Sequence, residues 1–297
     1  MSMIAGQLSN TLTVTARLRA FSELLKTRLS LLVAFSCAFG FVLASPEVNI
    51  LKLLFVFVGG FLVSGASITL NQIFERDLDK VMRRTMRRPL PTHRVTVQEA
   101  WIFAGLCLTA GIALLMVYTN LLTVCLSLLS MVLYSFVYTP LKRVGPVAVF
   151  VGAIPGALPP LLGWTAATGA ISYEAWIIFG IQFIWQFPHF WAIAWVADDD
   201  YKKAGFKLLP SGGRKDLNTA IQIMIYTMFL IPLGLLPATF GITGIYSAVV
   251  ATVCGVLFFA QTFALMGDAN KKSALRIMFG SFLYLPIVQI AYLLDKV

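Results

Sequence analysis

Long apolar stretches and short polar segments alternate along the whole chain. Because a helix of about 20 mostly apolar residues crosses the hydrocarbon core of a bilayer, each stretch of that length predicts one membrane span. Nine such stretches are centred in residues 29–45, 50–74, 99–118, 120–139, 147–165, 175–197, 217–239, 244–266 and 275–294. The pattern therefore predicts an all-α polytopic membrane protein with nine transmembrane helices.

The composition favours a membrane protein over a nucleic-acid-binding one. Hydrophobic residues make up 59% of the 297 residues, and charged residues only 12%. A soluble domain of this length would need far more polar surface. The net charge of +10 could suggest nucleic-acid binding, but the sequence shows no soluble basic domain that would bind a nucleic acid. The four cysteines stand singly within apolar stretches, which predicts packing rather than disulfide or metal chemistry.

The basic residues are concentrated on alternate connecting segments. If the N-terminus lies inside, 21 of the 23 lysines and arginines fall on the inner segments, and only Lys52 and Lys296 fall outside. This asymmetry follows the positive-inside rule, and the odd number of spans then places the C-terminus outside. Residues 1–20 show no secretory signal, so a bacterial cytoplasmic (inner) membrane is favoured over a mitochondrial inner membrane.

One membrane domain is expected over residues 1–297. Within it, residues 1–28 are expected to form a cytoplasmic or interfacial segment, and residues 29–294 the nine-helix bundle. Two charged loops, 75–98 and 198–216, follow the second and sixth spans. Both are predicted on the inner face, with one aspartate-rich motif each, and are interpreted as cytoplasmic active-site loops.

The first charged loop belongs to the sequence NQIFERDLDKVMRRTMRRPLP, residues 71–91. If the second span continues as a helix past the membrane edge, Asn71, Glu75 and Asp79 share one face, with about 6 Å of rise between neighbours. Like charges at that spacing repel unless a cation lies between them, and Mg²⁺ takes one or two carboxylates together with water and phosphate oxygens. Asp77 points away from this stripe. The alternative is a charged helix end that neutralises itself.

The second charged loop begins with DDDYKK, residues 198–203. Successive helical residues point about 100° apart, so only one or two of its three acids can serve one site. Two acidic clusters on one face suggest two metal ions that grip a polyanion between them. Six basic residues are candidates for holding its phosphate oxygens: Arg84, Arg88, Lys142, Arg143, Lys202 and Lys203.

A diphosphate at the mouth of a lipid-facing cavity indicates an isoprenoid diphosphate, whose apolar tail can enter the bundle. Metal ions and basic side chains would stabilise the departing diphosphate and leave an allylic cation. Aromatic faces stabilise such a cation, although aromatic residues at helical spacing more often serve packing. The candidates are Phe74, Tyr134, Tyr138, Trp185 and Trp191.

Several motifs resemble those of the intramembrane aromatic prenyltransferase superfamily. NQIFERDLD followed by MRRT and RRPLP is similar to its first aspartate-rich motif. The likeness covers nearly the whole chain and, within the superfamily, is to the protoheme IX farnesyltransferases, or haem O synthases. The other motifs that carry it are ELLKTRLSLL, VYTPLKR, GALPPLLGW, QFPHFWAIAW and DDYKKAGFKLLP.

This resemblance implies a prenyltransferase that moves a farnesyl group from farnesyl diphosphate to the 2-vinyl group of haem B, with water added, giving haem O. It implies Mg²⁺ as the cofactor. The metal ligands carried over are Asn71, Glu75 and Asp79, with one or two of Asp199 and Asp200, and the diphosphate contacts are Arg84, Arg88, Lys142 and Arg143. The partners suggested are the two substrates, membrane lipid, and a haem A synthase or terminal-oxidase assembly pathway. No nucleic acid is expected.

The chain departs from the family pattern at three places. Glu75 stands where Asp is frequent, which keeps an oxygen ligand. Thr27 stands where Pro is common, which affects only the shape of the first helix. Val196 and Asp198 stand where bases or other polar residues are frequent, and this leaves the choice among the three acids open.

His189 follows Pro188 inside the sixth predicted span. An ionisable side chain within a span is costly and is therefore a functional candidate. One interpretation is that its imidazole approaches the iron or a propionate of haem. The other is that it is a neutral residue hydrogen-bonded between helices.

Two rival functions share some of these features. A prenyltransferase of the same superfamily could act on another acceptor, such as 4-hydroxybenzoate or chlorophyllide. A divalent-cation transporter would need acids buried at mid-membrane, where carrier sites usually lie. No Asp or Glu falls in the middle of any predicted span, which argues against a transporter.

Overall fold

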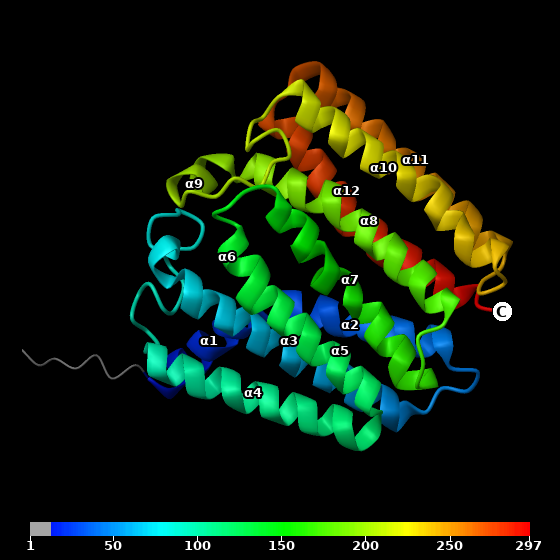
Figure 1. The fold of residues 1–297 in the computed structure, drawn as a ribbon, viewed down its shortest axis with the longest axis horizontal. Coiled ribbons are helices and arrows are strands. Elements are labelled where there is room, and N and C mark those ends of the chain that lie inside the picture. Colours follow the sequence, from blue (N-terminus) through cyan, green and yellow to red (C-terminus); the bar gives the residue numbers. More distant parts are fainter. Residues whose placement is uncertain (1–12) are drawn as a thin grey trace, which may run out of the picture.

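The computed structural model describes residues 13–297, and residues 1–12 of the expected N-terminal segment lie outside this range. Within it every regular element is a helix (Figure 1). The elements are α1 (Val14–Leu25), α2 (Thr27–Ala44), α3 (Ile50–Asp79), α4 (Val97–Tyr118), α5 (Leu121–Val132), η1 (Leu133–Tyr138), α6 (Thr139–Leu141), α7 (Val147–Thr168), α8 (Tyr173–Val196), α9 (Asp198–Lys203), α10 (Leu217–Thr239), α11 (Ile245–Asp268) and α12 (Lys271–Leu294). In this described range nine segments are long and apolar enough to cross a membrane, which confirms the predicted number.

α3 extends the second span beyond its predicted end. The helix continues through Glu75 to Asp79, so the first acidic residues of the expected loop 75–98 are helical. The chain then makes a series of turns as far as Thr96. Thr96 caps α4 through a reciprocal pair of hydrogen bonds with Glu99, which defines where the loop ends.

The fourth span contains a π-helix. α5 leads into η1, and α6 completes the same span from Leu121 to Leu141. A π-helical turn carries an extra residue per turn and is frequent at functional sites. In this span it precedes Thr139, whose Oγ1 accepts a hydrogen bond of 2.9 Å from Asn71 Nδ2 on α3.

The N-terminal segment forms a short helix joined to the bundle by a strained residue. α1 packs against α3, and Thr13 caps it by accepting a hydrogen bond from the Ala16 N–H. Lys26 joins α1 to α2 with φ of 44° and ψ of 59°. This left-handed conformation is costly for a residue with a Cβ, so the surrounding contacts must hold it.

α7 and α8 lie in the middle of the bundle. α7 packs against α2, α5 and α8, and α8 also packs against α10 and α12. α3 and α4 form one flank, and α10, α11 and α12 form the other (Figure 1). The turns after α3, the short α6 and α9 gather at one end, and the C-terminus lies at the opposite end.

The two charged loops touch each other at this end. The Asp200 carboxylate accepts backbone hydrogen bonds from the Arg83 N–H at 3.2 Å and the Arg84 N–H at 3.1 Å. The Lys207 N–H donates to the Lys142 carbonyl at 3.3 Å, which joins the second loop to the end of α6. Residues far apart in the sequence thus form one polar surface.

α2 and α7 approach each other so closely that only glycine fits at two positions. A Cβ on Gly163 would lie 1.8 Å from the Cys37 carbonyl oxygen, and one on Gly40 would lie 1.9 Å from the Pro160 carbonyl oxygen. Close backbone contact through small residues is a common way for helices to associate within a membrane.

We expect the charged end of the bundle to lie in the cytoplasm, because it carries nearly all the basic residues. Topology reporters fused after Thr92 and after Gly212 should both give cytoplasmic signals. A reporter fused after Gly169, between α7 and α8, should give an external signal. Signals from opposite sides at Thr92 and Gly212 would contradict both this orientation and the contact between the loops.

Candidate active site

A cavity of about 150 Å³ lies at the charged end of the bundle. α3, the turns after it, η1, the end of α8 and the α9 region all contribute to its wall, and we call it the charged cavity. Its lining residues are Lys26, Asn71, Glu75, Asp79, Met82, Arg84, Thr85, Arg88, Tyr134, Tyr138, Lys142, Phe190, Ile193, Tyr201, Phe206 and Leu208. One part of the wall is charged and another is aromatic, as an amphiphilic ligand requires.

The predicted stripe on α3 faces this cavity. Asn71, Glu75 and Asp79 are all buried and all line the charged cavity. The Asp79 carboxylate accepts two hydrogen bonds from Arg88 Nη1, at 2.8 and 2.7 Å. Asp77 is instead exposed and pairs with Lys80 at 2.8 Å. The structure therefore separates Asp77 from the other two acids, as the helical spacing predicted.

Lys142 is the basic partner of Glu75. Its Nζ lies 2.8 Å from Glu75 Oε1 and 4.6 Å from the centre of the Tyr138 ring. Burial alone would lower the pKa of the Lys142 ammonium, but the Glu75 carboxylate and Tyr134 outweigh it, and this pKa lies above its ordinary value. Lys142 is therefore a fixed positive charge in the cavity wall at neutral pH.

Lys26 is a cavity residue that the sequence reasoning missed. Its left-handed backbone lets it line the charged cavity from the junction of α1 and α2. Within residues 13–297 it forms no ion pair. Burial, followed by the neighbouring charges of Arg88 and Lys142, lowers the pKa of Lys26 to about 7. No signal in the sequence marks a lysine as left-handed, since Gly and Asn are the usual residues in that conformation.

Basic side chains outnumber acidic ones in the charged cavity. The lining holds Lys26, Arg84, Arg88 and Lys142 against only Glu75 and Asp79. Arg84 also donates to the Tyr201 hydroxyl at 3.2 Å and lies 5.6 Å from that ring's centre. Like charges gathered in a partly buried site destabilise one another unless an anion joins them. The arrangement is therefore suited to a polyanion.

The second acidic cluster meets this cavity through Tyr201 rather than through its carboxylates. Asp198 is buried and pairs with Lys202 at 2.8 Å and Lys215 at 3.0 Å. Asp200 accepts the two backbone hydrogen bonds described above, and Asp199 is exposed. None of the three acids lines the charged cavity, and neither do Lys202 and Lys203. Binding of a second metal ion here therefore stays a prediction.

The comparison with known families decides the identity. Residues 33–285 match the model of the UbiA prenyltransferase family. The chain belongs to this family. A protoheme IX farnesyltransferase from Cytophaga hutchinsonii is 52% identical over 285 residues, which are 96% of this chain and 100% of that protein. The resemblance inferred from the motifs is thereby confirmed, and the chain is a prenyltransferase.

Two solved structures share the fold of this prenyltransferase. One, described for digeranylgeranylglyceryl phosphate synthase, has a TM-score of 0.77 and 21% identity, and the match covers 94% of this chain and 98% of that one. The other is a UbiA homologue from Archaeoglobus fulgidus bound to GPP and Mg²⁺, with a TM-score of 0.62 and 16% identity over 92% of this chain and 99% of that one. At these identities the likeness shows the fold.

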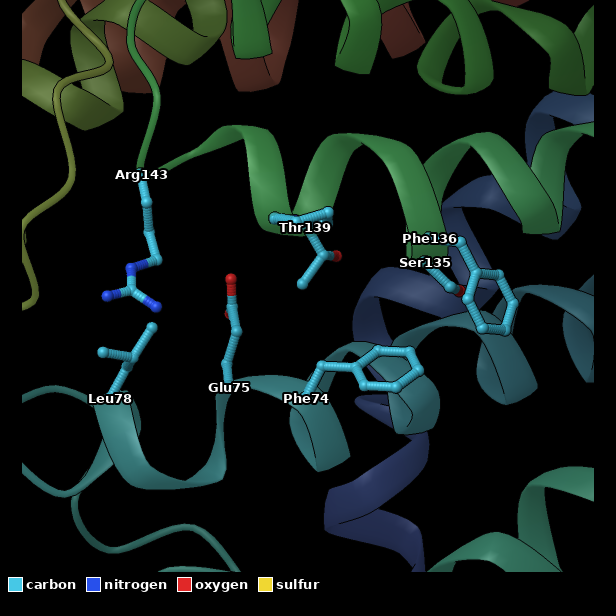
Figure 2. Close-up of a pocket in the computed structure, with 8 residues that line it drawn as sticks. Phe74, Glu75, Leu78, Ser135, Phe136, Thr139 and Arg143 are labelled. Carbon is cyan, nitrogen blue, oxygen red and sulfur yellow. The ribbon is translucent and has the colours of Figure 1, made fainter.

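A second, more open pocket of about 500 Å³ adjoins the charged cavity and shares Glu75 with it. Phe74, Phe136 and Leu78 are among its apolar lining residues. Figure 2 shows Arg143 reaching into it from beyond α6 and Glu75 reaching into it from α3. Arg143, predicted as a diphosphate contact, thus stands in this neighbouring pocket.

His189 lies deeper on α8 than the charged cavity. Its Nδ1 is 2.9 Å from Ser281 Oγ on α12, and its ring stacks on Trp185 with centroids 4.3 Å apart. The aromatic residues predicted to stabilise an allylic cation also differ in whether they line the charged cavity. Tyr134 and Tyr138 line the charged cavity, whereas Trp185 and Trp191 do not.

The charged cavity can hold a divalent cation only together with other oxygen ligands. Within residues 13–297 no three His, Cys, Asp or Glu side chains converge as a metal site. Mg²⁺ needs only one or two carboxylates when water and phosphate oxygens complete its shell. Glu75, Asp79 and the amide oxygen of Asn71, whose nitrogen is taken by Thr139, supply that set of donors. These residues fit Mg²⁺ in the presence of a phosphate ligand.

Lys26→Asn should weaken the affinity for a prenyl diphosphate by about 10-fold at pH 6.5, because it removes one charged contact. Asn tolerates the left-handed backbone, so the helix junction should persist. Bound diphosphate favours the ammonium form and raises its pKa. Lys26 therefore contributes fully to diphosphate binding below about pH 7. This contribution is lost as the pH rises through the higher pKa that Lys26 has in the complex.

Titration calorimetry at several pH values checks this prediction. Lys80→Asn, which alters an exposed lysine paired with Asp77, is the control and should match the parent protein throughout. A difference in affinity between the parent and Lys26→Asn that grows with increasing pH would contradict the assignment of Lys26 as a charged diphosphate contact.

Proposed function

We propose that this prenyltransferase moves a farnesyl group from farnesyl diphosphate to the 2-vinyl group of haem B, in a Mg²⁺-dependent reaction that gives haem O and diphosphate. The observation that carries the proposal is the charged cavity, where buried carboxylates and surplus basic groups meet an aromatic wall at one end of an apolar bundle. The relative from Cytophaga hutchinsonii, a protoheme IX farnesyltransferase, supports the choice of donor and acceptor.

Mg²⁺ would be held by Asn71, Glu75 and Asp79. The solved UbiA homologue bound to GPP and Mg²⁺ supports a divalent cation in this fold. When bound, the cation neutralises the diphosphate and makes it a better leaving group. Asp199 and Asp200 are proposed for a second metal ion, and Asp200 would then exchange its two backbone N–H partners for metal.

The bond that breaks joins C1 of the farnesyl chain to the diphosphate oxygen, and the electron pair leaves with the diphosphate. Arg84, Arg88 and Lys142 stabilise the charge that develops there. The rings of Tyr138 and Phe190, with centroids 6.1 Å apart, flank the allylic cation left at C1. C1 then bonds to the terminal carbon of the vinyl group. Water adds to the other vinyl carbon and releases a proton.

The remaining basic residues have lesser roles in this proposal. Arg143 reaches into the neighbouring pocket, where it can meet the diphosphate only beside Glu75. Lys202 pairs with Asp198, so it and Lys203 would reach phosphate only if α9 moved. The charged end would face the cytoplasm of a bacterial inner membrane. The haem O product would pass to a haem A synthase or a terminal-oxidase assembly pathway.

An acceptor comparison tests this function. The purified protein would be incubated with radiolabelled farnesyl diphosphate, Mg²⁺ and one of three acceptors: haem B, 4-hydroxybenzoate or chlorophyllide. We expect label to enter only the haem fraction, with a product heavier than haem B by one farnesyl group and one hydroxyl group, and we expect EDTA to stop the reaction. Label in either of the other acceptors, with none in haem, would favour the rival prenyltransferase.

A further inference from the structure

His189 lies on α8 directly before Phe190, which lines the charged cavity. It precedes Ile193, which lines the charged cavity, by four residues. Residues four apart lie on nearly the same face of a helix, separated by about 6 Å along its axis. His189 therefore lies just beyond Phe190, the deepest residue of α8 in the cavity wall. Its ring stacks on Trp185 and meets the edge of Phe282, with the centroids of the latter pair 5.2 Å apart.

Ser281 determines which imidazole nitrogen carries the proton. Its Oγ lies 2.9 Å from His189 Nδ1 and 2.6 Å from the Met278 carbonyl oxygen. A serine hydroxyl has a single proton, and a carbonyl oxygen can only accept. Ser281 donates its hydroxyl proton in the shorter contact, to the Met278 carbonyl oxygen. Its Oγ therefore accepts the second hydrogen bond, from the Nδ1–H of His189. A neutral imidazole has one N–H, and its lone pair is therefore on Nε2.

Nε2 is available to a ligand. Within residues 13–297 it has no hydrogen-bond partner, and protein atoms do not fully enclose it. The Ser281 carbonyl accepts a hydrogen bond of 3.0 Å from Trp185 Nε1, which joins α8 to α12 next to His189. The His189 ring is therefore held between Ser281 and Trp185. Histidines that bind metals show the same arrangement, in which the second ring nitrogen donates to a fixed oxygen.

We infer that Nε2 of His189 ligates the iron of a metalloporphyrin acceptor, and that Ser281 is the positioning residue that holds the required tautomer. The inference rests on the proposed function, because it needs an iron porphyrin as the acceptor. It adds the ligating atom, the tautomer and the second residue. An iron bound at His189 brings the edge of the porphyrin toward the level of Phe190 and Ile193, where the charged cavity begins.

Porphyrin binding with and without iron tests the inference. The purified, detergent-solubilised protein would be titrated with haem B and with metal-free protoporphyrin IX, followed by visible absorbance and tryptophan fluorescence. The parent protein should bind haem B more tightly and show the spectrum of a histidine-ligated haem. His189→Gln should lose both the spectrum and the preference for the iron form, while binding protoporphyrin IX and farnesyl diphosphate as the parent does.

Ser281 is tested in the same titrations. Ser281→Ala should weaken haem binding by about 10-fold, as the loss of a residue that orients a metal ligand typically does, and leave protoporphyrin IX binding unchanged. Ser281→Thr keeps the hydroxyl and should restore haem binding. Thr262→Val on α11 is the matched control, because within residues 13–297 that buried hydroxyl bonds only the Phe259 carbonyl.

The outcomes separate this inference from the proposed function. If His189→Gln keeps the parent's haem spectrum and its preference for iron while haem is still farnesylated, the inference is wrong and the proposed function stands. If the parent protein neither binds haem nor farnesylates it, the proposed function fails and the inference fails with it. Equal weakening of haem and protoporphyrin IX in Ser281→Ala would show a packing role and overturn the positioning role.

Discussion

Asp79→Asn should reduce prenyl transfer by about 100-fold or more, whereas Asp77→Asn should change it by less than about 3-fold. Asp79 is 0% exposed and accepts both of its hydrogen bonds from Arg88 inside the charged cavity. Asn keeps the shape of the side chain but removes the negative charge that a divalent cation and Arg88 both require. Asp77 stands outside the cavity, paired with Lys80 and Arg76.

Both variants would be assayed for turnover with labelled farnesyl diphosphate over a range of Mg²⁺ concentrations. Melting curves in detergent would show whether each variant is folded. We expect the Mg²⁺ requirement to rise for Asp79→Asn and to stay unchanged for Asp77→Asn. Equal loss of turnover in two folded variants would refute the assignment of the α3 stripe to the active site.

Gly163→Ala should destabilise the fold by about 1–3 kcal/mol or more, because its methyl group would meet the backbone of α2. The Cβ would lie 1.8 Å from the Cys37 carbonyl oxygen and 2.5 Å from the Phe41 nitrogen. No flexible side chain can move aside there, so α2 and α7 would have to separate. Since α2 begins directly after Lys26, the shift should also reduce farnesyl diphosphate binding.

Gly180→Ala on α8 is the matched control, because a Cβ at that position would meet nothing within 4 Å. Alanine favours a helix by about 1 kcal/mol over glycine, so this variant should be as stable as the parent or slightly more so. Thermal unfolding in detergent measures both effects. A Gly163→Ala protein that melts with the parent would show that the contact between α2 and α7 is looser than described.

Features that depend on local spacing could be predicted from the sequence. The apolar stretches defined the nine spans found within residues 13–297, because span length follows from membrane thickness. The period of the helix placed Asn71, Glu75 and Asp79 on one face and Asp77 on another. The two charged loops were predicted on one face from their charge, and in the structure Asp200 contacts the turns after α3.

Features that depend on tertiary contacts were not predictable from residue patterns. Lys26 adopts its left-handed backbone at the junction of α1 and α2, and a Lys–Thr pair carries no sign of it. The π-helix before Thr139 has no compositional signature either. The sequence reasoning grouped Arg143 with Lys142, its neighbour in the chain. The structure points Lys142 into the charged cavity and Arg143 into the adjoining pocket.

The central claim is that the charged cavity holds the diphosphate of the farnesyl donor. An experimental structure of the protein with Mg²⁺ and a non-reactive thio analogue of farnesyl diphosphate tests it most directly. The account predicts diphosphate density between Asp79, Arg88 and Lys142, with the isoprenoid chain running past Phe190 and Ile193 into the apolar bundle. Diphosphate density at another part of the molecule, with the charged cavity empty and its ion pairs intact, would contradict the account.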